Sequence, residues 1–394
     1  MKFAWLAVGT LVISACGSGG GSDKPANSAG SGSGGSASTA GSAAMPQGGS
    51  QPQAGSASGG TSSGNGGSSG GGGATAGAGS GSGGAAGGSG GATAKGFVCP
   101  AGPFDMPTLN VVPTRVEGVP PADAFNNNNN DFTNIEGDVW VGDALYVSEI
   151  NPGKPAPPPA RLLKITADGK VSIVAPDSGT NGLAVNDAGE LFGALHKDGS
   201  ISKLSLTDGA ATLVANMYMG KRFDSPNDLT IHKNGTIYFT DPDWQSAKPT
   251  PQAATRAYRI PPGGMPQPIE ELSQPNGITL NKDQTVLYIG GNQLKKYSVM
   301  ADGSLGAGSD FVAGGNADGM VIDCADNLYT ASNGVTVYSS AGAKLGTITV
   351  AGLGQVTNVA FGGADHKTLY ISGQGSGMQK GLFKATMNVP GFPY

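Results

Sequence analysis

Six related segments recur along the chain at nearly regular intervals, and this repetition constrains the fold more than any other feature. They begin at residues 135, 180, 226, 275, 317 and 357. Each holds a polar residue, usually followed by Gly or Asp, then an alternating apolar stretch, a Gly/Asp/Asn turn and a second apolar stretch, as in "PNDLTIHKNGTIYFT". Each segment is therefore predicted to form a β-hairpin.

The spacing of the hairpins predicts how they assemble. Their second residues are 40 to 49 residues apart, which is the period of a propeller blade. Further strand-like pieces such as "RLLKITADGKVSIVA" lie between the hairpins and can supply outer strands. We predict an all-β fold, a six-bladed β-propeller in which "GLFKATMNV" near the C-terminus shares a sheet with residues around 109–116 and so closes the ring.

The first quarter of the chain has a different composition from the rest. Residues 17–95 contain no aromatic residue, and only Asp23, Lys24 and Lys95 carry charge. Such a segment buries too little apolar surface to offset the entropy lost on ordering. We expect a signal peptide at 1–15, a disordered Gly/Ser/Ala-rich linker at 16–95 and the propeller at 96–394.

The N-terminus has the pattern of an export signal. "MKFAWLAVGTLVISAC" has one Lys and an apolar run that is too short to span a bilayer. Its end, Ile13 to Cys16, resembles a bacterial lipobox, which implies cleavage before Cys16 and a lipid on its sulfur; the alternative is an ordinary signal peptide with an incidental cysteine. We expect an exported bacterial lipoprotein, periplasmic or on the cell surface, that meets the membrane through its lipid only.

Two cysteines remain once Cys16 is assigned to lipidation. Cys99 and Cys324 would lie in a compartment where disulfides persist, and we predict that they pair, the alternative being two buried thiols. The net charge of −5 and the lack of a Lys/Arg cluster argue against a nucleic-acid partner. We expect a monomer that binds a small molecule.

The polar residue near the start of each hairpin sits at one repeated offset. In a propeller, residues at one offset form a ring around the axis, and side chains that offer oxygen without His or Cys suit calcium better than zinc. Magnesium, manganese and zinc remain alternatives to Ca²⁺ as the single divalent cation. The six residues are Glu136, Asn181, Asn227, Asn276, Asp318 and Asn358.

Several motifs resemble those of the gluconolactonase and regucalcin family of six-bladed propellers. They include "EGDVW", "NGLAVNDAGEL", "GKRFDSPNDLTIHKNGTIYFTDPDW", "QPNGITLNKDQTVLYIGG" and "ADGMVIDCADNLY", and the match covers residues 130–394. The resemblance implies a divalent cation bound by Glu136, Asn227, Asn276 and Asp318, and hydrolysis of a sugar lactone or similar cyclic ester. Asp318 would also accept a proton or orient water.

Other residues are candidates for substrate contact or proton transfer. We assign substrate contact to Asn181, Arg222 and Asn358. His196 sits where related lactonases carry a histidine that faces the pocket, and it either orients substrate and shuttles a proton or is hydrogen-bonded within its blade. His366 lies in a polar turn and is expected to be solvated.

One departure from the family pattern bears on the cation. The family usually has Pro after "EG", whereas this chain has Asp138, which either adds an acid near the cation or faces solvent, the second being favoured. The same cation would serve hydrolysis of other esters or phosphoesters, and a non-catalytic binding propeller with a structural cation is a further alternative.

Overall fold

The computed structural model describes residues 97–122, 133–152 and 154–392. These residues form six four-stranded antiparallel sheets, so the predicted six-bladed propeller is confirmed. The predicted signal peptide, Cys16 and the linker lie outside the described residues. Within the described ranges, no helix is both long and apolar enough to cross a bilayer.

Each blade runs from an inner to an outer strand in chain order, except the sixth. Blade 1 consists of β2 (Asn134–Val141), β3 (Ala144–Ile150), β4 (Ala160–Thr166) and β5 (Val171–Ala175). Blade 2 consists of β6 (Thr180–Val185), β7 (Leu191–Leu195), β8 (Ser200–Leu204) and β9 (Ala211–Ala215). Blade 3 consists of β12 (Leu229–Ile231), β13 (Ile237–Asp241), β14 (Arg256–Ile260) and β15 (Gln267–Glu271). Blade 4 consists of β16 (Pro275–Leu280), β17 (Val286–Gly291), β18 (Lys295–Ser298) and β19 (Ser309–Asp310). Blade 5 consists of β20 (Met320–Ile322), β21 (Leu328–Ala331), β22 (Val335–Tyr338) and β23 (Lys344–Ile348). Blade 6 consists of β24 (Gln355–Gly362), β25 (Thr368–Gln374), β26 (Gly381–Thr386) and, outermost, β1 (Thr114–Arg115).

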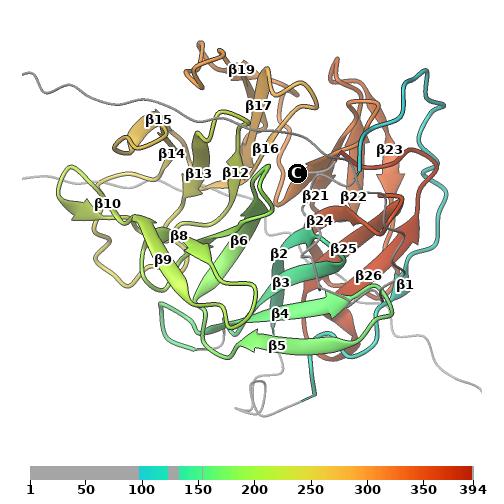
Figure 1. The fold of residues 1–394 in the computed structure, drawn as a ribbon, viewed down its shortest axis with the longest axis horizontal. Coiled ribbons are helices and arrows are strands. Elements are labelled where there is room, and N and C mark those ends of the chain that lie inside the picture. Colours follow the sequence, from blue (N-terminus) through green and yellow to red (C-terminus); the bar gives the residue numbers. More distant parts are fainter. Residues whose placement is uncertain (1–96, 123–132, 153, 393–394) are drawn as a thin grey trace, which may run out of the picture. The chain divides into compact units, whose positions relative to one another are not determined.

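The inner strands contact one another in a closed circuit. β2 contacts β6, β6 contacts β12, and the sequence continues through β16, β20 and β24 back to β2. Figure 1 shows the sheets following one another around the axis, with β2 of blade 1 inside and β5 outside. A polar residue at the start of each inner strand is thereby brought to one end of the axis.

The ring closes in blade 6, where the two ends of the folded chain share a sheet. β1 pairs with β26, with Thr114 opposite Lys384 and Arg115 opposite Phe383, as the sequence predicts. Arg115 also donates to the carbonyl of Lys380 at 2.6 Å. This pairing protects edges that an open sheet would expose.

Apolar side chains between neighbouring blades form the core. At the junction of blades 6 and 1, Trp140 stacks on Tyr370 with ring centroids 5.9 Å apart, next to buried Leu145, Leu163 and Leu382. Alternating apolar residues along each strand place one layer of side chains on each face of a blade. The alternation therefore accounts for blade packing on both sides.

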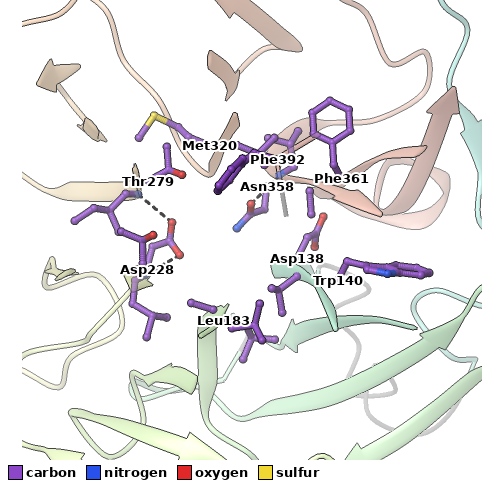
Figure 2. Close-up of a pocket in the computed structure, with 18 of the residues that line it drawn as sticks. Asp138, Trp140, Leu183, Asp228, Thr279, Met320, Asn358, Phe361 and Phe392 are labelled. Atoms are coloured by element: carbon purple, nitrogen blue, oxygen red, sulfur yellow. Dashed lines mark hydrogen bonds between the residues drawn. The ribbon is translucent and has the colours of Figure 1, made fainter. Parts of the chain in front are cut away.

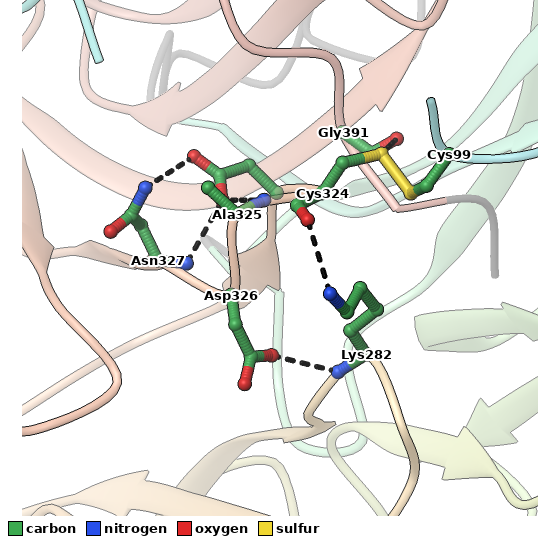
Figure 3. Close-up of a disulfide and its surroundings, with 8 residues drawn as sticks. Cys99, Lys282, Cys324, Ala325, Asp326, Asn327 and Gly391 are labelled. Carbon is green, nitrogen blue, oxygen red and sulfur yellow. Dashed lines mark hydrogen bonds between the residues drawn. A yellow bond between two sulfur atoms is a disulfide. The ribbon is translucent and has the colours of Figure 1, made fainter. Parts of the chain in front are cut away.

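A disulfide ties the start of the folded region to blade 5. Cys99 and Cys324 are bonded, with their Cα atoms 5.5 Å apart, which confirms the predicted pair. Figure 3 shows that the C-terminal segment passes the same point, near Gly391. The amide of Cys324 donates to the carbonyl of Pro390 at 2.8 Å. Three distant parts of the chain thus meet at this bond.

The turn that carries Cys324 is fixed by its own hydrogen bonds. The carboxylate of Asp323 accepts from the backbone of Ala325 and Asn327, both at 2.9 Å, and from the side-chain amide of Asn327 at 2.8 Å. Asp326 accepts from the backbone of Lys282 in blade 4 at 2.9 Å. Short polar side chains that bond to a nearby backbone hold turns in one conformation.

We expect that the disulfide contributes substantially to stability because it closes a loop of 225 residues in sequence. Replacing Cys99 by Ser should lower the free energy of unfolding by about 2–5 kcal/mol. Urea denaturation followed by circular dichroism measures this. The Cys324→Ser variant, and the wild-type protein in reductant, should match Cys99→Ser; an unchanged midpoint in all three would contradict the account.

Candidate functional site

Four of the predicted ring residues line one pocket. Glu136 comes from blade 1, Asn227 from blade 3, Asn276 from blade 4 and Asp318 from blade 5, and they share a cavity of about 390 Å³. They are separated by up to 182 positions in sequence, yet the propeller places them together. The structure therefore brings together all four residues that were predicted to bind the cation.

Irregular pairing at the start of the inner strands accompanies this arrangement. The register between β2 and β3 shifts between Glu136 and Val139, and that between β16 and β17 shifts between Pro275 and Ile278, on either side of Asn276. Asn227 and Asp318 stand just before β12 and β20 begin. A bulge re-aims side chains that a regular ladder would hold above and below the sheet.

The glycine that follows several ring residues allows the blades to approach closely. A Cβ atom on Gly137 would lie 2.1 Å from the carbonyl oxygen of Asn181 in blade 2. A Cβ atom on Gly277 would lie 2.0 Å from the carbonyl oxygen of Asp318 in blade 5. These distances explain why the repeats read "EG" and "NG", since a side chain there would push the next blade away from the axis.

Blade 3 has Asp228 in the place that these glycines occupy. One carboxylate oxygen of Asp228 accepts from the amide of Leu229 at 2.9 Å and the other from the amide of Ile278 in blade 4 at 3.1 Å. The side chain therefore links two blades directly below the pocket. Burial raises the pKa of Asp228 to about 7, which these two hydrogen bonds oppose.

The two acids of the pocket are held in an environment that disfavours their charge. Burial raises the pKa of Asp318 to about 8, Asp228 adds to the rise, and the side chain of Asn276 opposes it. Burial also raises the pKa of Glu136 well above its usual range, with further contributions from Asp318 and Asp138. Carboxylates gathered in this way need positive charge to ionise together.

The donor set fits a hard divalent cation. Glu136 and Asp318 offer carboxylate oxygens, and Asn227 and Asn276 offer carboxamide oxygens, which are ligands that calcium and magnesium prefer. Among the described residues, no group of three or more His, Cys, Asp or Glu side chains is arranged to hold a metal ion. A zinc site built on His or Cys is therefore absent from the described part, whereas a mixed carboxylate and carboxamide site matches the pocket.

Two other ring residues lie beside the pocket without lining it. Asn358 contacts the carboxylate of Glu136 and lowers its pKa, and its side-chain oxygen accepts from the amide of Val359 at 2.7 Å. Asn181 is buried in β6 and lends its backbone to the contact with Gly137. Their predicted contact with substrate stays a prediction.

The structure separates Arg222 from the pocket. Its guanidinium donates to the carbonyls of Asp198 at 2.9 Å, His196 at 3.2 Å and Lys197 at 2.7 Å. Arg222 belongs to the β10–β11 hairpin (Met217–Tyr218 and Lys221–Arg222), which packs beside blade 2. The side chain thus holds the 196–198 turn, and this position does not support the predicted substrate contact.

His196 also lies behind the pocket wall. It is fully buried, and its Nε2 donates to the carbonyl of Pro158 at 2.8 Å, while Nδ1 has no hydrogen-bond partner. Burial lowers the pKa of His196 to about 4, so the ring is neutral at pH 7. This geometry matches the alternative of a histidine hydrogen-bonded within the structure; His196 supports Pro158, which itself lines the pocket.

Two predictions of solvent exposure are wrong. Asp138 is 7% exposed and lines a second cavity, which lies between the inner strands (Figure 2). His366 is 8% exposed and stacks on Phe97 with ring centroids 4.3 Å apart. In both cases a polar residue near a turn was predicted to face solvent. Instead, the inner strands around the axis cover Asp138, and Phe97 of the N-terminal segment covers His366.

The pocket has wall residues that the sequence analysis missed. Trp244 and Gln245 follow β13, and Lys154 lies in the proline-rich connection between β3 and β4. Trp244 is 46% exposed, so its indole is available to a ligand in the pocket. Two sequence features could have indicated these wall residues: the proline-rich run around Lys154 and the aromatic residue that ends "TDPDW".

Stability of the cation-free protein should depend on pH through the pocket acids. Because the pKa of Asp318 is raised from 3.8 to about 8, the folded state keeps a proton that the unfolded chain releases, and stability falls as pH rises from about 4 to about 8. Thermal unfolding in chelator measures this fall. We expect saturating Ca²⁺ to reverse most of it and Asp318→Asn to flatten it; equal pH slopes for wild type and variant in chelator would contradict the account.

Comparison with known proteins agrees with this geometry. Residues 135–374 match the model of the "SMP-30/Gluconolactonase/LRE-like region" family. The chain is 30% identical over 276 residues to a gluconolactonase of Zymomonas mobilis, covering 60% of this chain and 75% of that protein. A gluconolactonase structure from Xanthomonas campestris is 28% identical, with a TM-score of 0.57, covering 74% of this chain and 99% of that one.

A more distant structure shares the fold. Regucalcin of Agrobacterium tumefaciens, described as a calcium-binding protein, is 20% identical with a TM-score of 0.52, covering 66% of this chain and 91% of that one. The family match spans all six inner strands, from Glu136 of β2 to Asn358 of β24. The chain therefore belongs to the SMP-30/gluconolactonase/LRE-like family of β-propellers.

Proposed function

We propose that this protein is a metal-dependent hydrolase that opens a sugar lactone or similar cyclic ester. The observation that carries the proposal is the convergence of Glu136, Asn227, Asn276 and Asp318 in one pocket at the axis. Two relatives named as gluconolactonases, one of them 30% identical, support lactone hydrolysis as the reaction. The calcium-binding relative supports Ca²⁺ as the cation, although it shares only the fold.

The four side chains would hold the cation through oxygen atoms alone. When bound, a divalent cation supplies a Lewis acid that polarises an ester carbonyl oxygen. Glu136 and Asp318 would contribute the two negative charges that balance it. Asn227 and Asn276 would contribute neutral oxygens, so that the net charge of the occupied pocket stays near zero.

Asp318 is the residue that we assign to proton transfer. It lines the pocket with one side open to the cavity, and the side chain of Asn276 is hydrogen-bonded to it. That contact fixes the direction of the carboxylate while water approaches the ester carbonyl. Asp318 would accept the proton that the attacking water loses, and the alkoxide leaving group of the opened ring would take up a proton in turn.

The walls of the pocket favour a ligand with polar groups around an apolar face. Trp244 offers an exposed indole, and Gln355 and Gln374, joined by a hydrogen bond of 2.6 Å, offer amide groups on the side of blade 6. Lys154 adds a positive charge on the side of blade 1. A sugar lactone combines hydroxyl groups with a C–H face that packs against an aromatic ring.

We also propose that the enzyme works outside the cytoplasm. The Cys99–Cys324 disulfide supports this location, because such bonds persist in oxidising compartments. The lipid-anchored start at Cys16 and the linker to residue 95 belong to the same proposal. They would leave the propeller free to meet soluble substrate while the lipid holds it at a membrane.

Replacing Asp318 by Asn tests the assigned reaction. The amide has nearly the same shape but cannot accept the proton, so turnover of an aldonolactone should fall by roughly 10²–10⁴-fold. Proton release in weakly buffered solution with a pH indicator measures the rate. Asp143→Asn, at an exposed turn between β2 and β3, is the matched control and should keep wild-type turnover.

Cation dependence is checked in the same assay. Turnover should be lost after treatment with chelator and return on addition of one of Ca²⁺, Mg²⁺, Mn²⁺ or Zn²⁺. Full activity of Asp318→Asn would refute its role in proton transfer. A wild-type protein with no activity on any lactone or ester, with or without cations, would instead favour a binding propeller.

A further inference from the structure

The pocket that contains the four proposed cation ligands has one basic side chain in its wall. Lys154 lines this pocket from the connection between β3 and β4. Among the described residues that line it, only Glu136 and Asp318 carry other ionisable side chains. A bound divalent cation would balance these two acids, as the proposed function requires. The charge of Lys154 is not balanced in that state, so the occupied pocket would be positive overall.

No acid of the described part of the chain neutralises Lys154. Its ammonium group forms no ion pair with a described residue, whereas Lys197, Lys203 and several other lysines pair with carboxylates. Lys154 is also half-buried, and it lies beside the cavity rather than on the open surface. A charge that is partly removed from water interacts more strongly with an opposite charge than a fully solvated one does. An anionic group in the pocket would therefore gain from this side chain.

The connection that carries Lys154 is stiff and held by hydrogen bonds. The amide of Asn151 donates to the carbonyl of Pro159 at 3.0 Å, and the amide of Lys154 donates to the carbonyl of Asn151 at 3.3 Å. Nε2 of the buried His196 donates to the carbonyl of Pro158 at 2.8 Å. Four of the five residues that follow Lys154 are prolines, which fix the backbone angle φ. A ligand that pairs with Lys154 thus has little backbone entropy to overcome.

Two other wall residues offer acceptors instead of donors. Asn134 and Gln245 line the pocket, and Oδ1 of Asn134 and Oε1 of Gln245 are buried without a hydrogen-bond partner. An amide oxygen accepts from a hydroxyl group, but it repels a carboxylate or a phosphate, which has only acceptor oxygens. Hydroxyl groups of a sugar would suit these two side chains. An acidic group on the same sugar would be directed away from them and toward Lys154.

We propose that the lactone preferred by this pocket carries an acidic group, a carboxylate or a phosphate, which pairs with Lys154. The inference rests on the proposed function and specifies its substrate class. A neutral sugar lactone would leave Lys154 without a counter-charge, whereas an anionic one neutralises it. Lys154 then determines specificity and takes no part in the reaction. Water adds to the ester carbonyl, the ring C–O bond breaks, and the acidic group is unchanged.

Two lactones that differ at one carbon test the proposal. D-Glucaro-1,4-lactone has a carboxylate where D-glucono-1,4-lactone has a hydroxymethyl group, and proton release measures the hydrolysis of both. The wild-type chain, supplied with cation, should have the higher kcat/KM for the anionic lactone. In Lys154→Gln the ratio of the two kcat/KM values should fall about tenfold. The change should lie in KM for the anionic lactone, because the lost contact is equal in the ground state and the transition state.

Matched variants and a second pair of lactones complete the test. Lys154→Arg keeps the charge and should keep most of the ratio, and Lys170→Gln, at an exposed position between β4 and β5, should keep all of it. D-Glucono-1,5-lactone 6-phosphate is compared in the same way with D-glucono-1,5-lactone. A ratio that depends on Lys154 in this second pair only would assign the acidic group as a phosphate.

Failure of the inference is distinguishable from failure of the proposed function. If the wild type hydrolyses these lactones and Lys154→Gln leaves both ratios unchanged, the inference is overturned and the hydrolase proposal stands. If the wild type hydrolyses none of them, the hydrolase proposal fails, and calorimetric titration of the intact protein decides the inference. D-Glucaro-1,4-lactone should then bind about tenfold more tightly than D-glucono-1,4-lactone, with the difference lost in Lys154→Gln. Equal affinities, or no binding of either lactone, would overturn the role of Lys154.

Discussion

Closure of the ring is the constraint on which the rest of the structure depends. β1 and β26 come from opposite ends of the folded region and share blade 6, so that β24 packs beside β2. Only a closed ring makes the first inner strand a neighbour of the last, and only then does Glu136 of blade 1 face the acid of blade 5 across the axis. The disulfide at Cys99 reinforces this closure from the N-terminal side. Fold stability and site geometry therefore have a common origin.

The same geometry forces like charges together. Glu136 is buried and Asp318 half-buried at one end of the axis, with Asp138 and Asp228 close to Glu136, and loss of solvent raises the pKa of all four. An apolar ring would be easier to bury, so this concentration of acids works against folding unless cations are present. Cation binding would then stabilise the fold at the place where it prepares the site for chemistry. The need for a cation to balance the buried acids therefore links the stability of the fold to the proposed activity.

The sequence predicted the features that repetition determines. Six hairpins at blade spacing predicted the architecture, and one offset within them identified a ring of six polar residues. The family resemblance then singled out Glu136, Asn227, Asn276 and Asp318 as the cation ligands. Such inference works because a propeller converts equal offsets into equal distances from the axis. The glycines after Glu136 and Asn276 belong to the same pattern, since each faces the backbone of the next blade. What lies between the repeats was less predictable: Arg222 bonds to carbonyls of a neighbouring turn, and Trp244 reaches the pocket from the connection between β13 and β14, which lies outside the repeated hairpins.

Anomalous diffraction from a crystal of the protein grown with Mn²⁺ would test the central claim most directly. The account predicts a peak at the axis within about 2.0–2.6 Å of oxygen atoms of Glu136, Asn227, Asn276 and Asp318. A crystal saturated with cation that shows no peak in contact with these four residues would contradict it.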